Sequence, residues 1–101
     1  MSLNIITRED VLIELRKLKP ELEKRYGVTR IGIFGSVARD EVRDDSDIDV
    51  VIEMSEPDLF SVVHIKETLE EDFKRPVDII RYRKKMNAFL KARIEREAIY
   101  V

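Results

Sequence analysis

Two aspartates separated by one residue are the part of this sequence best suited to chemistry. Asp47 and Asp49 flank Ile48 at the start of an apolar run that continues to Ile52. Because alternate residues of a strand point to the same face, the two carboxylates would lie side by side. Like charges at that distance repel each other unless a cation lies between them. Hard divalent cations with oxygen ligands, above all Mg²⁺, are the usual partners of such a pair.

A short turn lies ten residues before this pair. Gly35 and Ser36 follow the apolar run from Ile31 to Phe34. Glycine lets the backbone turn sharply and approach a phosphate closely, and Ser36 can add a hydroxyl donor. A backbone-exposed turn beside a carboxylate-bound metal could hold a triphosphate. Alone, a Gly-Ser pair is typical of an ordinary strand-to-helix turn, so the phosphate interpretation depends on the downstream carboxylates.

Asp78 is a third acid within a short apolar run. On its own it could be held by a neighbouring arginine, Arg75 or Arg81. A strand at 77–80 placed beside a strand at 48–53 would instead bring Asp78 to the aspartate pair. Three carboxylates can hold two divalent ions, roughly 3.5–4 Å apart in sites of this type.

The aspartates also have a simpler explanation, because the loop before them is rich in acids and the pair could merely cap it. Asp49 favours the functional interpretation, since a carboxylate inside an apolar strand needs a partner. Asp44 and Asp45 lack that context and are predicted to be loop residues. Arg39 and Arg43 could contact phosphates, but pairing with the acidic loop is the stronger expectation.

The stretch Gly35-Ser36-Val37-Ala38-Arg39, with Asp47-Ile48-Asp49 after it, resembles the signature of the polymerase-beta-like nucleotidyltransferase superfamily. From about Thr7 to the C-terminus the chain is most similar to the minimal, MNT-type branch. That branch is the antitoxin half of HEPN/MNT toxin–antitoxin pairs. The spacing between the two motifs fits the pattern without insertion. One residue departs from it, because Asp40 stands where minimal members often have glycine.

This resemblance implies Mg²⁺-dependent transfer of a nucleoside monophosphate, AMP from ATP, to a hydroxyl with release of pyrophosphate. It implies that Asp47, Asp49 and Asp78 bind two Mg²⁺ ions and that Gly35 and Ser36 hold the triphosphate. One ion would activate the attacking hydroxyl and the other would neutralise the leaving group. Asp78 is expected to be the general base as well. The implied acceptor is a tyrosine hydroxyl on a partner HEPN-type toxin protein.

Two alternatives stay open. The protein could be a non-catalytic antitoxin that neutralises its partner by contact, although the three intact acids argue against this. It could also modify a small molecule, with the acceptor site formed by homo-oligomerisation. Larger relatives use a second domain to bind the acceptor, whereas residues 1–101 are expected to form a single minimal domain. Another molecule would therefore bring the acceptor.

Composition limits the remaining classes. The chain is 40% charged and 44% hydrophobic, which argues for a folded domain, and it has no cysteine for disulfides or thiolate metal sites. No apolar run approaches the ~20 residues of a membrane span and no signal peptide is visible, so a cytoplasmic protein is expected. Acids concentrate between Asp40 and Asp72 and basic residues between Arg75 and Arg96. Nucleic acid is not expected as the main partner, because no basic stripe interleaved with aromatics is present.

The apolar patterns predict an α/β domain with a small mixed sheet of about three to four strands flanked by helices. A helix capped by Thr7 should end at Gly27, with a kink or restart at Pro20. Further elements are predicted as strands at 29–34, 48–53, 77–80 and 98–101 and helices at 37–40, 59–73 and around 86–94. The short link between the first two strands favours antiparallel pairing, and the helix before the third strand permits a parallel crossover.

Overall fold

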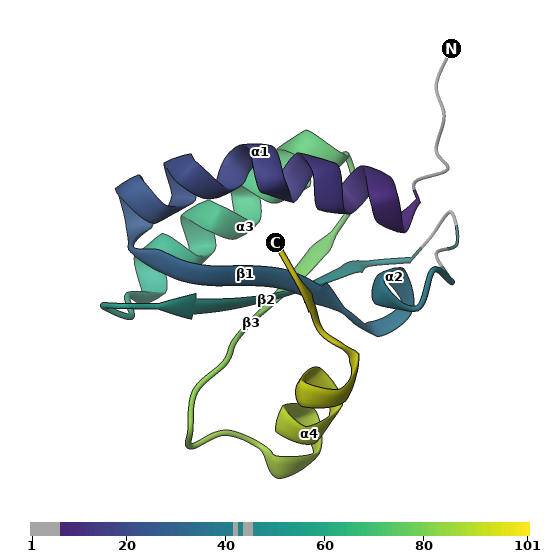
Figure 1. The fold of residues 1–101 in the computed structure, drawn as a ribbon. Coiled ribbons are helices and arrows are strands. Elements are labelled where there is room, and N and C mark those ends of the chain that lie inside the picture. Colours follow the sequence, from purple (N-terminus) through teal and green to yellow (C-terminus); the bar gives the residue numbers. More distant parts are fainter. Residues whose placement is uncertain (1–6, 42, 44–45) are drawn as a thin grey trace.

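The computed structural model describes residues 7–41, 43 and 46–101. Over these residues helices and strands alternate along the chain (Figure 1). The elements in order are α1 (Arg8–Tyr26), β1 (Val28–Phe34), α2 (Gly35–Ala38), β2 (Ile48–Met54), α3 (Leu59–Phe73), β3 (Val77–Arg81), α4 (Ala88–Glu97) and β4 (Ile99–Tyr100).

The sheet has four strands in the order β3-β2-β1-β4. β1 pairs antiparallel with both β2 and β4, whereas β2 and β3 are parallel. The parallel pair is possible because α3 carries the chain back along the sheet, while the link from β1 to β2 is too short for such a crossover. The predicted mixed α/β sheet and the antiparallel first pair are confirmed.

Helix α1 begins and ends as the sequence predicts. The Thr7 side chain accepts a hydrogen bond from the Asp10 backbone, and the Asp10 side chain accepts one from Thr7 in return, forming a capping box. Gly27 ends the helix with a left-handed φ of 70°. The expected restart at Pro20 is wrong, because α1 runs as one helix from Arg8 to Tyr26. Buried leucines on both sides of the proline pack into the same core and hold the two halves together.

Helices cover both faces of the sheet, giving three layers. Figure 1 shows α1 and α3 on one face and α4 on the other. The main core lies under α1 and α3 and contains every second residue of β2, namely Ile48, Val50 and Ile52. A smaller cluster of Phe34, Val51 and Ile94 lies under α4.

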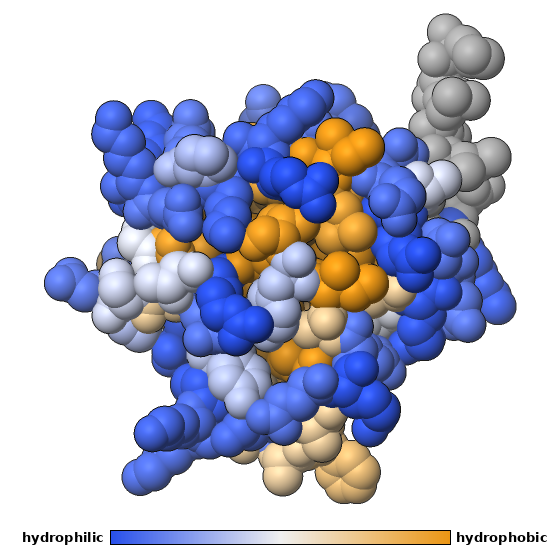
Figure 2. All heavy atoms as spheres, in the orientation of Figure 1, coloured by the Kyte–Doolittle hydropathy of each residue, from blue (hydrophilic) through white to orange (hydrophobic). Residues whose placement is uncertain are grey.

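Strand alternation then decides where the candidate residues lie. The neighbours of Asp49 and Asp78 in the sequence belong to the main core, so both aspartates point to the α4 face. On the visible side, Figure 2 shows apolar side chains in the middle of the molecule, between α1 and the C-terminal end, with hydrophilic side chains around them. None of the helices described is long and apolar enough to cross a membrane.

Candidate active site

The structure brings two of the three predicted acids directly opposite each other. Asp49 on β2 is the register partner of Asp78 on β3, and both point to the α4 face. Asp49 is partly buried, whereas Asp78 is exposed. Asp47 lies just before β2 and is exposed. The expected neighbourhood of Asp49 and Asp78 on adjacent strands is therefore observed. The convergence of all three acids in one metal site, and their chemical roles, stay predictions.

Asp49 is the electrostatically strained member of the group. Desolvation raises the pKa of its carboxyl above the ordinary value, and the charge of Asp78 raises it further. Asp47 adds a smaller push in the same direction, while Arg93 and Arg39 oppose it. Asp78 and Asp47 are therefore both close enough to Asp49 to repel its charge, and negative charge accumulates at this end of β2 and β3.

A divalent cation would relieve that repulsion, and carboxylate oxygens are the donors that Mg²⁺ prefers. Among the residues that the structure describes, however, no three acidic, histidine or cysteine side chains lie close enough together to form a metal site as they stand. The donor set thus fits a hard cation in chemistry, and binding would require the side chains to turn toward it. Asp47 and Asp78 have room to do so because both are exposed.

The turn at Gly35 lies against Asp49. Gly35 has a φ of 73°, which other residues adopt with strain. A Cβ atom at this position would also overlap Asp49 Oδ2 and come within 3.1 Å of Arg93 Nη2. Glycine therefore allows the turn and the carboxylate to share one small volume. Ser36 is partly exposed and borders a polar depression that is also lined by Arg39, Glu41, Arg43 and Ser46.

The backbone conformation after this turn explains how position 40 can hold an aspartate where the resembling family often has glycine. Asp40 has a left-handed φ of 60°, the conformation for which glycine is the default residue. Aspartate is among the few other residues that visit this region. The Arg8 backbone N–H donates to its carboxylate at 3.4 Å, which ties the loop to the start of α1. Asp44 and Asp45, predicted to be loop residues, lie outside the described residues.

Two residues of α4 also belong to this site, and sequence reasoning missed them. Glu97 accepts a hydrogen bond from the Gly35 N–H at 3.1 Å and one from Arg39 Nη1 at 3.0 Å. Arg93 lies one helical turn earlier, and its Nε is 3.4 Å from the same carboxylate oxygen. Arg39 also pairs with Glu41 at 3.0 Å, as expected for a partner in the acidic loop. The available hint in the sequence was their spacing. Arg93 and Glu97 lie four residues apart, next to the apolar Ile94, so a helix places them on the same side.

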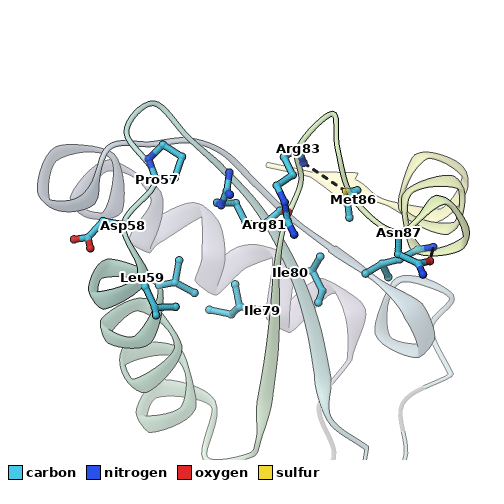
Figure 3. A pocket seen from close by; sticks show the side chains of 11 residues that line it. Pro57, Asp58, Leu59, Ile79, Ile80, Arg81, Arg83, Met86 and Asn87 are labelled. Atoms are coloured by element: carbon cyan, nitrogen blue, oxygen red, sulfur yellow. Dashed lines mark hydrogen bonds between the residues drawn. The ribbon is translucent and has the colours of Figure 1, made fainter.

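A groove of about 560 Å³ lies farther along β3. Figure 3 shows Leu59, Ile79 and Ile80 in a row along it, with Arg81 and Arg83 beside them on the side of Pro57. Ile80 is two residues after Asp78 on the same strand, so both point to the α4 face. The groove therefore shares strand β3 with Asp78, and its lining is mostly apolar, with two arginines and one acid, Asp58.

Comparison with known proteins identifies the family. The model of the nucleotidyltransferase domain family matches residues 15–101, and the chain belongs to this family. The protein adenylyltransferase MntA of Thermococcus cleftensis is 33% identical over 98 residues, covering 96% of this chain and 98% of that protein. These matches confirm the resemblance to minimal nucleotidyltransferases, and with them the assignment as an enzyme of this class.

Solved structures agree with the fold. A structure assigned to a minimal nucleotidyltransferase superposes with a TM-score of 0.76 at 35% identity, covering 93% of this chain and 95% of that one. The MNT antitoxin solved in complex with a tri-AMPylated Shewanella oneidensis HEPN toxin gives a TM-score of 0.68. At 16% identity, over 93% of this chain and 71% of that one, this second likeness shows the fold alone.

Proposed function

We propose that this protein transfers AMP from ATP to a hydroxyl of a partner protein, a HEPN-type toxin, and so acts as its antitoxin. The observation that carries the proposal is the register pairing of Asp49 with Asp78 on the face that also holds the Gly35 turn. Residues 1–101 would act as one minimal domain. The proposed partner follows the similar antitoxin that was solved in complex with a HEPN toxin.

Asp47, Asp49 and Asp78 would hold the metal, and the accumulated negative charge around Asp49 supports this assignment. When bound, two Mg²⁺ ions would neutralise the phosphate charge and lower the pKa of the attacking hydroxyl. The Gly35 N–H, the Ser36 hydroxyl and the Arg39 guanidinium would hold the triphosphate by donating hydrogen bonds to its oxygens.

The reaction itself needs one proton acceptor and a good leaving group. The acceptor oxygen forms a bond to the α-phosphorus while the bond from that phosphorus to the bridging α,β-oxygen breaks, and pyrophosphate leaves with its electron pair. Asp78 would take the hydroxyl proton, because it is the exposed carboxylate of the pair and can be reached by an incoming group. Asp49 is partly buried beside the Gly35 turn, and it would act as a metal ligand at the triphosphate.

Exposed apolar side chains support a protein acceptor. Leu59, which lines the groove on β3, is 77% exposed, and its neighbour Phe60 is equally exposed. Phe89, at the start of α4, is 90% exposed. Large apolar side chains at that exposure favour docking of another protein.

The test is incubation of the full chain with α-labelled ATP, Mg²⁺ and a candidate HEPN-type toxin, followed by detection of label on the toxin. We expect labelling by the wild type and none by Asp78→Asn. Glu71→Gln, which changes an exposed acid on α3, should label normally as the matched control. Label on neither protein, despite a stable complex, would favour the contact-only antitoxin. Rapid modification of a free small molecule would favour the oligomeric small-molecule enzyme.

A further inference from the structure

The carboxylate of Glu97 is surrounded by groups that would suit a phosphate. One of its oxygens accepts hydrogen bonds from the Gly35 N–H at 3.1 Å, from Arg39 at 3.0 Å and from Arg93 at 3.4 Å. Its other oxygen is 3.8 Å from Arg96, and the side chain is only 15% exposed. A backbone N–H and guanidinium groups around an oxyanion are the usual components of a phosphate site.

The stability of helix α4 does not explain this position. Glu97 is the last residue of the helix, where the dipole disfavours a negative charge. The pair Arg93–Glu97 also has the cation on the N-terminal side, which is the weaker order for residues four apart. The contacts that hold Glu97 are therefore those to the turn, through Gly35 and Arg39.

Arg93 lies between the two charged parts of the site. Its Nη2 atom is close to Gly35 and to the Asp49 carboxylate, and its charge lowers the pKa of Asp49 against the larger effects of desolvation and Asp78. Its Cζ atom is 5.6 Å from the centre of the Phe34 ring, which holds the guanidinium over the strand end. Arg93 thus supplies a cation beside Asp49, and Glu97 supplies an anion on the Gly35 N–H.

A metal-bound phosphate would bring the same two charges to this site, a cation beside Asp49 and an anion on the Gly35 N–H. We propose that Arg93 is a phosphate ligand of the nucleotide and that Glu97 holds the phosphate subsite until the nucleotide arrives. On binding, a phosphate oxygen would replace the Glu97 carboxylate on the Gly35 N–H, Arg39 and Arg93. This inference rests on the proposed function, because it assumes that the turn binds a triphosphate.

A purely structural role for Glu97 makes the opposite prediction for affinity. If Glu97 only held Arg39 and Arg93 in place, removing its charge would loosen both and weaken nucleotide binding. If it competes with phosphate, removing its charge leaves the same donors in place with a weaker competitor. Glu97→Gln keeps the size and an acceptor oxygen, so the direction of the affinity change separates the two roles.

The experiment is calorimetric titration of the full chain with Mg²⁺ and a non-hydrolysable ATP analogue, repeated with tripolyphosphate in place of the analogue. Glu97→Gln should lower both dissociation constants by about tenfold, the size expected for one charge-assisted hydrogen bond. Arg93→Gln should raise both by a similar factor. Glu95→Gln removes the same charge from an exposed position of the same helix, and should stay within about twofold of the wild type.

Wild-type protein supplies a second readout if the variant does not fold. On addition of Mg²⁺ and tripolyphosphate, the Gly35 amide resonance and the Glu97 side-chain carboxyl resonance should shift together in nuclear magnetic resonance spectra. Tight binding by the wild type with unchanged or weaker binding by Glu97→Gln, or a Glu97 resonance that stays fixed, would overturn this inference alone. Absence of binding to every folded variant and to the wild type would overturn the proposed triphosphate site as well.

Discussion

The two faces of the sheet differ in what their side chains do. Under α1 and α3 the face is filled with fully buried aliphatic residues, among them Leu15, Ile33 and Ile65. Under α4 the buried part that the structure describes is a small cluster around Phe34, Val51 and Ile94, and Asp49, Asp78 and the charged residues of α4 lie beside it. The difference indicates that one face supplies most of the stability and the other supplies the chemistry. Substitutions on the two faces should therefore have separable effects.

The largest expected effect is on the α4 face. Asp49→Asn should reduce nucleotidyl transfer by about a thousandfold or more, because it removes a proposed ligand of the metal that would neutralise the phosphate charge. The melting temperature should stay the same or rise, since the Asn side chain ends the repulsion from Asp78 and Asp47. Label transfer and thermal melting, each with and without Mg²⁺, measure the two effects. Near wild-type transfer would show that Asp49 is not a metal ligand.

The matched change on the other face is Leu15→Ala. Leu15 is fully buried under α1, so the cavity should lower the free energy of unfolding by about 2–5 kcal/mol. Transfer measured per folded molecule should change less than about threefold, because the acids point to the opposite face. Urea unfolding and label transfer at low temperature check this pair of outcomes. A large loss of transfer by the folded fraction of Leu15→Ala would contradict the conclusion that one face supplies stability and the other supplies the chemistry.

The pH dependence of stability should separate Glu97 from Asp49. Desolvation raises the pKa of Glu97, but the Gly35 hydrogen bond and the charges of Arg39 and Arg93 outweigh it and hold the pKa below its ordinary value of 4.5. This carboxylate therefore stabilises the fold fully above pH 4.5, and the contribution is lost as the pH falls through the lowered pKa. The pKa of Asp49 is raised above 3.8, so its ionisation destabilises the fold as the pH rises through that range.

Two variants make this measurable by urea unfolding between about pH 3 and pH 7. Glu97→Gln should be less stable than the wild type at neutral pH, and the difference should shrink toward pH 3. Asp49→Asn should be more stable at neutral pH, and that gain should also vanish in acid. If both variants were more stable than the wild type at neutral pH, or both less stable, the electrostatic environments assigned to Glu97 and Asp49 would be wrong.

The smallest effect is expected at Asp40. Glycine adopts the left-handed φ of 60° without strain, and among the described residues it would remove one side-chain hydrogen bond, the 3.4 Å bond from the Arg8 N–H. Asp40→Gly should therefore change the free energy of unfolding by less than about 1 kcal/mol and leave transfer intact. Asp40→Val, with a β-branched side chain, should cost about 1–2 kcal/mol. Equal stability of the two variants would refute the conformational argument.

Much of this arrangement could be predicted from local sequence. The Thr7 cap, the Gly27 stop and the alternation along β2 gave the elements and the shared face of Asp49 and Asp78. The role of α4 could not be read in the same way. It depends on the two residues of β4 that pair with β1 through Gly32↔Tyr100 and place the end of α4 over the turn. A strand at 98–101 was predicted, but two paired residues are too few for the sequence to indicate which strand they join or where α4 then lies. Pro20 misled because core packing overrode its local preference.

The most direct test of the proposed active site is to locate the metal on the protein. Mn²⁺ added with a non-hydrolysable ATP analogue should broaden the nuclear magnetic resonance signals of residues nearest the bound ion. We predict selective broadening at Asp47, Asp49, Asp78 and Gly35, lost in Asp49→Asn. Broadening centred instead on the exposed acids of α3, such as Glu67 and Glu71, and unchanged in Asp49→Asn would contradict a metal-dependent active site on the α4 face.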